Sequence, residues 1–230
     1  MPIGQASTPA GSRIAPTAEG LRLLDGLAGI RKENLEFFKR WVPVPASATG
    51  STMVRGVAIP TGIIQETAPA YENRQNWLVS SDYYLSERSQ IRARYLNFKI
   101  DLIDTVANLG AFFEPVPDRC QLASLSEFHT FSPTLANEIR AGFQRETLTQ
   151  EVTSRPTLAG LDSFPNIGFT DWGLTIGPNQ NSPQSRVINT MQLSDNLTWI
   201  KNKHTLKFGY DGRKLNSTSF FVQRNRGDYQ

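Results

Sequence analysis

The stretch "MQLSDNLTWIKNKHTLKFGYDGRK" (residues 191–214) alternates in hydropathy on both sides of a short polar turn. Before the turn every second residue from Met191 is apolar, apart from Asp195, and after it Leu206, Phe208 and Tyr210 resume the pattern. A period of two residues is typical of a β-strand, and two such runs joined by a few polar residues predict a β-hairpin. The stretch therefore predicts two antiparallel strands, each with one apolar and one polar face.

Two further pairs of alternating runs precede this hairpin, joined by the short segments "SERS" and "SPTLA". In the run after "SERS" the alternation slips at Leu96, which indicates a β-bulge or the end of that strand. We predict six antiparallel strands paired in sequence order as a meander, at about 74–86, 89–100, 118–131, 136–150, 186–200 and 204–216.

The first third of the chain has a different pattern. Residues 1–16 are rich in Pro, Gly, Ser and Ala, and residues 43–71 are similar, so both segments are predicted to be irregular, with a brief strand near "TMVRGVAI". Between them, residues 17–41 have helical spacing with a break at Gly29, which predicts two short amphipathic helices. We therefore divide the chain into a loop-like segment, residues 1–73, and a strand segment, residues 74–230.

The connections between the predicted strands are unequal in length. Within each pair the turn is short, whereas residues 101–118 and 151–185 form long connections at the opposite end of the sheet. Short turns at one end and long loops at the other are typical of a transmembrane β-barrel, in which the turns face the periplasm and the loops face outside. Runs of roughly 9 to 12 residues also fit strands that cross a bilayer at a tilt.

Alternation alone fits a soluble β-sandwich equally well, because one face is apolar in both folds. Aromatic residues near the turns favour the barrel, since such residues form girdles at the membrane interface; they are Tyr83, Tyr84, Phe131 and Trp199. The favoured fold class is all-β, a partial transmembrane antiparallel β-barrel with short helices near the N-terminus. A soluble β-sandwich binding module stays as the alternative.

In a barrel the apolar face of each strand meets lipid and the polar face lines the lumen. The candidate lipid-facing residues are Leu193, Leu197, Trp199, Leu206, Phe208 and Tyr210. The candidate lumen-facing residues are Arg92, Arg94, Glu138, Arg140, Lys207, Asp211 and Arg213. These charged residues are expected to form a network on the lumen wall, with an anionic solute as the alternative reason for the arginines.

Several function classes are not indicated by the composition. The net charge of +3 is dispersed among acidic residues, so a nucleic-acid partner is not expected. The single cysteine, Cys120, excludes a disulfide framework, and the two histidines, His129 and His204, lack the neighbours that a metal site or an activated nucleophile requires. We expect no enzyme activity, no catalytic residues, no cofactor and no metal.

The longest predicted loop contains three aromatic residues, Phe164, Phe169 and Trp172. They would either pack this loop against its neighbours, which we favour, or form an external surface that binds a carbohydrate or a peptide. The helices of residues 17–41 are likewise expected to pack on other loops.

Several segments resemble the barrel region of TonB-dependent outer-membrane receptors, in particular the Oar-like group with a carboxypeptidase-regulatory-like N-terminal domain. The segments are "RQNWLVSSDYYLSERSQIRARY", "LSEFHTFSPTLANEIRAGFQR", "LDSFPNIGF", "IGPNQNSPQ" and "NTMQLSDNLTWIKNKHTLKFGYDGRK". The resemblance extends from Thr17 to Gln230. It implies a location in the outer membrane of a Gram-negative bacterium, a barrel of about 22 strands, a plug domain, the TonB system and outer-membrane lipid as partners, and energised uptake of a bulky solute.

The chain departs from this family pattern in what surrounds the strands. No signal peptide, regulatory-like domain, plug or TonB box precedes the matching segments, and "RGDYQ" reads as the beginning of another strand. Because barrel diameter grows with strand number, six strands do not enclose such a lumen. We therefore expect a fragment of a receptor barrel that does not transport on its own.

Overall fold

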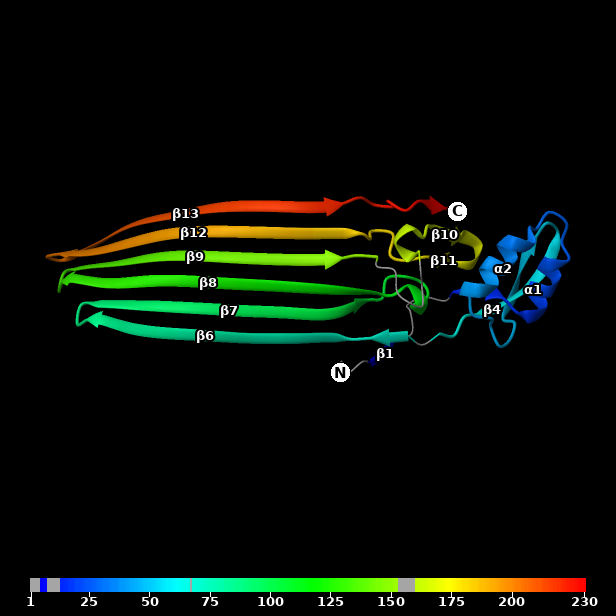
Figure 1. Ribbon diagram of the computed structural model, residues 1–230, viewed down its shortest axis with the longest axis horizontal. Helices are drawn as coiled ribbons and strands as arrows, with labels where there is room; N and C mark the ends of the chain where they lie inside the picture. Colours follow the sequence, from blue (N-terminus) through cyan, green and yellow to red (C-terminus); the bar gives the residue numbers. More distant parts are fainter. Residues whose placement is uncertain (1–4, 8–12, 67, 153–159) are drawn as a thin grey trace.

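The computed structural model describes residues 5–7, 13–66, 68–152 and 160–230. Its largest unit is a six-stranded sheet in the order β13-β12-β9-β8-β7-β6, in which every neighbouring pair is antiparallel (Figure 1). The strands are β6 (Glu72–Ser86), β7 (Ser89–Asp104), β8 (Glu114–Ser132), β9 (Leu135–Gln150), β12 (Gln184–Lys201) and β13 (His204–Phe221). The predicted six-stranded meander is therefore confirmed.

The strands extend further than the sequence predicted, so the turns are tighter. Residues 87–88, 133–134 and 202–203 form the three turns, in place of the longer segments expected from "SERS" and "SPTLA". Asn202 has a φ of 54°, a left-handed conformation that asparagine adopts more readily than most residues. Because the strands continue to these positions, each hairpin is closed by a turn of only two residues.

The expected slip at Leu96 is wrong. Leu96 lies in register with Leu78 on β6 and Leu122 on β8, and β7 continues beyond it without interruption. The register shifts instead beside the turns, between Tyr84 and Ser86 and between Thr130 and Ser132. The alternation seemed to fail at Leu96 because its face, which is charged near the turn, becomes apolar toward the cap, where Phe98 and Ile100 follow it.

The loop end of the sheet carries a compact cap, built mainly from the first third of the chain and the long connection before β12 (Figure 1). The two predicted helices are present as α1 (Ala18–Asp25) and α2 (Lys32–Trp41). Thr17 caps α1, because its hydroxyl accepts a hydrogen bond from the backbone N–H of Gly20 at 3.3 Å.

The prediction that residues 43–71 are irregular is wrong except for the brief strand expected near "TMVRGVAI", where the structure has a hairpin. They contain β3 (Gly50–Val54) and β4 (Val57–Ile63), which pair with β2 (Ile14–Pro16) in a three-stranded sheet of order β2-β4-β3. Arg55 and Gly56 form the turn between β3 and β4 with φ values of 51° and 83°. Two successive positive φ angles are the signature of a type I′ hairpin turn, which glycine at the second position favours.

The long connection before β12 is also folded where the structure describes it. Its elements are η2 (Leu161–Ser163), β10 (Asn166–Phe169), η3 (Thr170–Trp172) and β11 (Leu174–Ile176). The strand β14 (Asp228–Tyr229), which follows β13, pairs in parallel with β10. Three further short elements are η1 (Gly110–Phe112), β1 (Gln5–Ser7) and β5 (Ala68–Ala70). In the N-terminal segment predicted to be loop, β1 and β2 are strands, and residues 1–4 and 8–12 lie outside the described residues.

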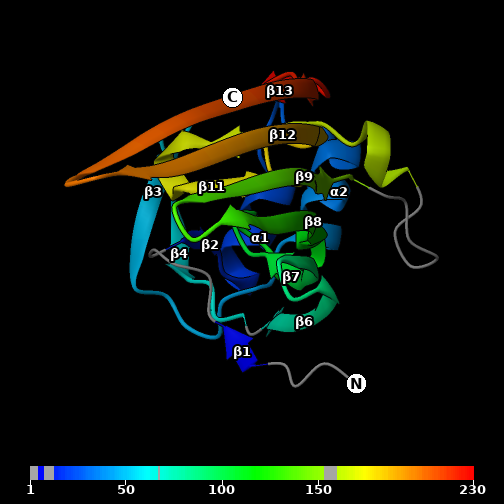
Figure 2. The ribbon, with the colours of Figure 1, turned by 90° about the vertical axis from the view of Figure 1, so that its left-hand side faces the viewer.

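The hydrophobic core lies in the cap and not beneath the sheet. Leu24, Phe38, Phe112 and Ile176 are buried there, so elements from both sides of the predicted boundary after residue 73 share one core. By contrast, Phe208 and Tyr210 on the sheet are 57% and 63% exposed. Seen from the turn end, the six strands form one layer with the helices beyond it (Figure 2).

The packing therefore does not support the soluble sandwich. Within the part of the chain that the structure describes, no second sheet covers the six strands, and the sheet is open, with β6 and β13 at its edges. Among the same residues, neither helix has the length and apolar character required to cross a membrane.

Candidate functional site

The register of the sheet assigns the predicted site residues to its two faces. All seven charged candidates lie on one face, the polar face, because Arg140 is in register with Ser126 on one side and Ser194 on the other, and Ser194 with Asp211. This set comprises Arg92, Arg94, Glu138, Arg140, Lys207, Asp211 and Arg213. They share one face as the alternation indicated, since side chains of a strand point to opposite sides in turn, while their place on a lumen wall stays a prediction.

The six apolar candidates lie together on the opposite face, the apolar face. Leu197 is in register with Phe208, and Trp199 with Leu206 on one side and Leu135 on the other. Apolar residues of four more strands extend this face, among them Val79, Ile91, Leu125, Ile139 and Phe143. Leu193 is 47% exposed and Phe143 39% exposed, so nothing in the described chain covers them.

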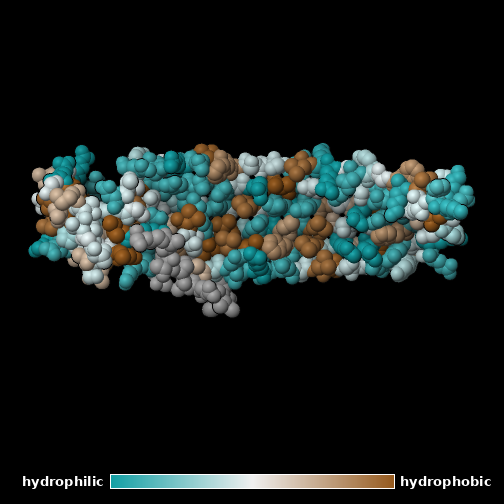
Figure 3. Space-filling model, turned by 180° about the vertical axis from the view of Figure 1, so that it is seen from behind, coloured by the Kyte–Doolittle hydropathy of each residue, from teal (hydrophilic) through white to brown (hydrophobic). Residues whose placement is uncertain are grey.

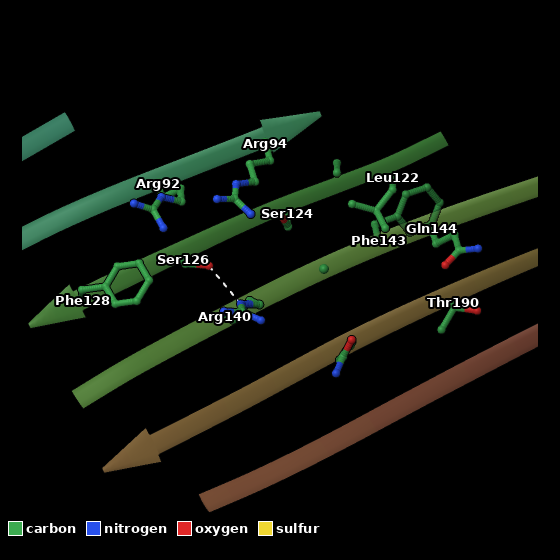
Figure 4. A pocket seen from close by; sticks show the side chains of 13 residues that line it. Arg92, Arg94, Leu122, Ser124, Ser126, Phe128, Arg140, Phe143, Gln144 and Thr190 are labelled. Atoms are coloured by element: carbon green, nitrogen blue, oxygen red, sulfur yellow. Dashed lines mark hydrogen bonds between the residues drawn. The ribbon is translucent and has the colours of Figure 1, made fainter. Parts of the chain in front are cut away.

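The polar face contains a hollow of about 260 Å³ near the middle of the sheet (Figure 4). Four neighbouring strands supply its polar lining, because their register brings distant segments together. The main polar side chains are Arg92 and Arg94 from β7, Ser124 and Ser126 from β8, Arg140 and Gln144 from β9, and Gln192 from β12. Figure 3, which shows the molecule from behind, has mainly hydrophilic residues toward the turn end and hydrophobic patches nearer the cap.

Most cations around this hollow are already paired with carboxylates. Arg92 Nε lies 2.6 Å from Asp82 Oδ1, and the guanidinium also lies over the ring of Phe128, 5.4 Å from its centre. Arg140 pairs with Glu138 and donates a hydrogen bond to Ser126 Oγ at 3.2 Å. Water screens such exposed pairs, so they organise the surface more than they stabilise it.

Arg94 is the exception in this hollow. Among the described residues it has neither an ion-pair partner nor a hydrogen-bond partner, although it lies beside Ser124 (Figure 4). An exposed guanidinium carries five N–H donors in a planar fork that suits carboxylate and phosphate groups. The hollow can therefore bind an anionic or hydroxyl-rich group by hydrogen bonding.

The network continues onto the edge strand. Asp211 accepts hydrogen bonds from Gln192 at 2.5 Å and from Arg213 at 3.2 Å. Lys207, two residues before Gly209, is exposed on the same face near the turn. Near the turns the polar face is thus a surface of charges and amides, and toward the cap it carries apolar residues such as Leu96, Phe98 and Leu122.

The remaining titratable residues form no obvious reaction centre. In the described ranges no three His, Cys, Asp or Glu side chains are grouped to hold a metal ion. His129 lies 3.9 Å from Glu127, and His204 is exposed at the beginning of β13. Cys120 accepts a weak hydrogen bond from Gln144 at 3.6 Å.

The aromatic residues of the long loop pack as predicted. The Phe164 ring lies 5.4 Å from that of Trp41, and the Phe169 ring stacks on that of Trp172 at 5.3 Å, with Phe38 against their edges. The indole of Trp172 donates a hydrogen bond to Thr52 Oγ1 at 3.2 Å. A mainly apolar hollow of about 630 Å³ remains between the helices and these rings, so the packed cap still offers an aromatic surface.

The sequence reading missed the structural role of Arg226. Its guanidinium donates hydrogen bonds to the carbonyl oxygens of Phe164 at 3.0 Å, Asn179 at 2.8 Å and Ser182. Burial lowers the pKa of Arg226 below its ordinary value, with Glu114 acting in the opposite direction. Nothing in the motif "RGDYQ" indicated this role, because the carbonyl partners lie 44 to 62 residues away in the chain.

The comparisons with known proteins agree with this architecture. No curated protein and no solved structure matches the chain. The profile of one protein family, described as an outer membrane beta barrel domain, matches residues 27–230, which include the two-faced sheet and most of the cap. The chain therefore belongs to the outer membrane beta barrel domain family and is an outer-membrane protein.

Proposed function

We propose that the chain forms part of the barrel of a TonB-dependent outer-membrane receptor of the Oar-like group, which takes up a bulky solute with energy from the TonB system. The observation that carries the proposal is the division of one sheet into a charged, hydrogen-bonded face and an uncovered apolar face. A water-filled or plugged lumen suits the first face and lipid suits the second.

The orientation follows from the connections. Turns of two residues lie at one end of the sheet and the cap lies at the other. In outer-membrane barrels short turns face the periplasm and long loops face outside. The cap would then stand at the extracellular mouth, where its aromatic hollow is available to a carbohydrate or a peptide.

The open sheet needs further strands. The edges β6 and β13 offer unpaired backbone N–H and C=O groups, which a membrane does not satisfy. Barrel closure would therefore require additional strands on both sides, and a plug would occupy the lumen. We do not propose that this sheet transports by itself, nor do we propose an enzymatic activity.

The faces can be tested with two neighbouring residues of β8, Ser124 on the polar face and Leu125 on the apolar face. In a Cys120→Ser background, Ser124→Cys should react with a small hydrophilic maleimide, whereas Leu125→Cys should be protected from it. A fluorophore at residue 125 should be quenched by a lipid-soluble quencher. The reversed pattern, or equal labelling of both positions, would contradict a lumen on the polar face.

Plug and TonB dependence need the receptor in cells. A photoreactive residue at position 124 should cross-link to a plug segment, identified by mass spectrometry of the cross-linked peptides. In cells with TonB, an energy poison should change the yield of this cross-link. In cells that lack TonB, the cross-link should still form, but the poison should no longer change its yield. Cross-linking to lipid alone would argue against the proposal.

A further inference from the structure

Four basic residues form a belt on the apolar face, on the loop side of its hydrophobic band. Lys99 lies on β7, Arg119 on β8, Arg145 on β9 and Lys214 on β13, and all four are exposed. The register joins them on one face, since Lys99 is in register with Arg119, and both Lys214 and Phe143 are in register with Met191. We call this set the basic belt.

The basic belt differs from the polar face in how its charges are satisfied. On the polar face five arginines form ion pairs, namely Arg74–Glu72, Arg92–Asp82, Arg140–Glu138, Arg186–Glu146 and Arg213–Asp211. In the belt, Arg119 donates to the amide oxygen of Asn97 and Arg145 to that of Asn189, both at 3.0 Å. Across the described chain, no carboxylate forms an ion pair with any belt residue.

Carboxylates are scarce on this face as a whole. Within the six strands it carries three, and two of them, Glu127 and Asp195, lie in the row of Ile139 within the hydrophobic band, nearer the turns than the belt. Asp101 lies one row beyond Lys99 toward the cap. The belt therefore presents positive charge that the protein itself does not neutralise.

Lys99 and Arg119 lie in one row, and the belt residues beyond them shift toward the turns. Arg145 is in register with Gln121, two residues nearer the turns than Arg119. Lys214 is in register with Met191 and Phe143, two residues nearer the turns again. From β7 to β13 the belt thus moves by about 13 Å along the strands over roughly 19 Å of sheet width.

This shift corresponds to a line inclined by about 35° to the perpendicular of the strands, which is the tilt of strands in membrane barrels. When the strands are tilted by this angle in the direction of the shift, the four basic residues come to within about one residue of the same depth in the membrane. A belt at constant depth is a feature of a surface that meets a flat boundary, so its natural partner is the plane of lipid headgroups.

We infer that the basic belt binds the phosphate groups of anionic lipid headgroups in the outer leaflet. The inference rests on the proposed orientation, in which the apolar face meets lipid and the cap lies outside. The hydrophobic band would contact the acyl chains while the belt meets the phosphates directly above them. Arginine suits this role because its fork binds phosphate through two parallel hydrogen bonds.

The test compares two variants that lose the same charge. The belt variant combines Lys99→Gln, Arg119→Gln, Arg145→Gln and Lys214→Gln, and the control combines Arg94→Gln, Arg140→Gln, Lys207→Gln and Arg213→Gln on the polar face. Each protein is extracted from membranes in mild detergent and titrated with a bisphosphorylated, acylated glucosamine disaccharide lipid, with native mass spectrometry as the readout. The dephosphorylated lipid serves as the second probe.

The wild type and the control should retain the phosphorylated lipid, and the belt variant should bind it at least about tenfold more weakly. Raising the ionic strength should weaken binding of the phosphorylated lipid to the wild type. If the combined variant fails to fold, the comparison of the two lipids on the wild type still tests the dependence on phosphate. Equal binding by the belt and control variants, or of the two lipids, would overturn the inference.

The labelling of residues 124 and 125 separates this failure from a failure of the proposed function. If lipid protects Leu125→Cys from labelling, but the belt and control variants bind the phosphorylated lipid equally well, only the lipid inference is wrong. If Leu125→Cys labels from water, both the proposed orientation and the inference built on it are wrong.

Discussion

Arg226 donates a hydrogen bond from its Nε to the backbone carbonyl of Phe164 at 3.0 Å, which joins the segment after β13 to the long loop before β12. The same guanidinium binds the carbonyl oxygens of Asn179 and Ser182. One side chain thus closes the cap over the loop end of the sheet, and its removal should have an effect beyond its own surroundings.

Arg226→Ala should lower the free energy of unfolding of the cap by about 1–3 kcal/mol, because several carbonyl oxygens lose a charged donor. The control is Arg224→Ala, which removes an ion pair with Asp228 at 2.8 Å from a guanidinium that is largely exposed. Melting followed by the fluorescence of Trp41 and Trp172 should report a larger shift for Arg226→Ala. Equal shifts would mean that Arg226 does not hold the loop.

Phe112→Ala should destabilise the cap by about 3–5 kcal/mol, because it removes a fully buried ring that packs on Trp41 and Phe164. The nearby Val106 is 65% exposed, so Val106→Ala should change stability by less than about 0.5 kcal/mol. Limited proteolysis of the loop end measures the effect. Rapid cleavage in both variants would show that the core is not centred on Phe112.

Gly20→Ala should weaken the contact between α1 and β4. A methyl group at Gly20 would lie 2.5 Å from the carbonyl oxygen of Pro60, whereas at Gly50 it would meet nothing within 4 Å. We expect a loss of about 1–3 kcal/mol for Gly20→Ala and little change for Gly50→Ala, measured by thermal unfolding. Similar stability of both variants would indicate that the helix moves away from the sheet without cost.

Phe208→Arg should impair assembly of the receptor in the outer membrane far more than Lys207→Gln. The two residues are neighbours on β13, but they lie on opposite faces of the sheet. In a barrel wall a charge at mid-depth in lipid costs about 2–4 kcal/mol, while a lumen residue tolerates substitution. Heat-modifiable migration of the membrane fraction measures assembly, and equally mild effects would contradict a lipid-facing Phe208.

Much of the sheet could be predicted because strand periodicity is a local property. Side chains of a strand alternate between its faces, so the letters around Lys207 and Phe208 already separate charge from apolar surface. The pairs β6–β7, β8–β9 and β12–β13 followed from short turns, since strands joined by a few residues pair as neighbours. The neighbours β7–β8 and β9–β12 are joined by long connections, so their pairing was inferred from the barrel pattern. Which solvent each face meets stays a prediction, because the same alternation occurs in soluble sheets.

Prediction from the local pattern failed where pairing with neighbouring strands, and not the type of the residue, decides the conformation. Leu96 interrupts the alternation, yet its register with Leu78 and Leu122 keeps β7 continuous. The hairpin of β3 and β4 was predicted only as one brief strand, because it is short and contains Pro60, which lowers strand propensity. Here pairing with β2 and packing of α1 outweighed the local preference.

The sequence by itself determined the two-faced strands, their tight turns and the amphipathic helices, because hydropathy period and turn chemistry act over a few residues. Only the tertiary structure decided how the cap closes and how charges from distant segments are distributed over the faces. Arg226 meets carbonyls from another loop, and Arg119, Arg145 and Lys214 align only once the register is known. Such relationships depend on strand pairing between residues far apart in the chain, and no local pattern encodes that pairing.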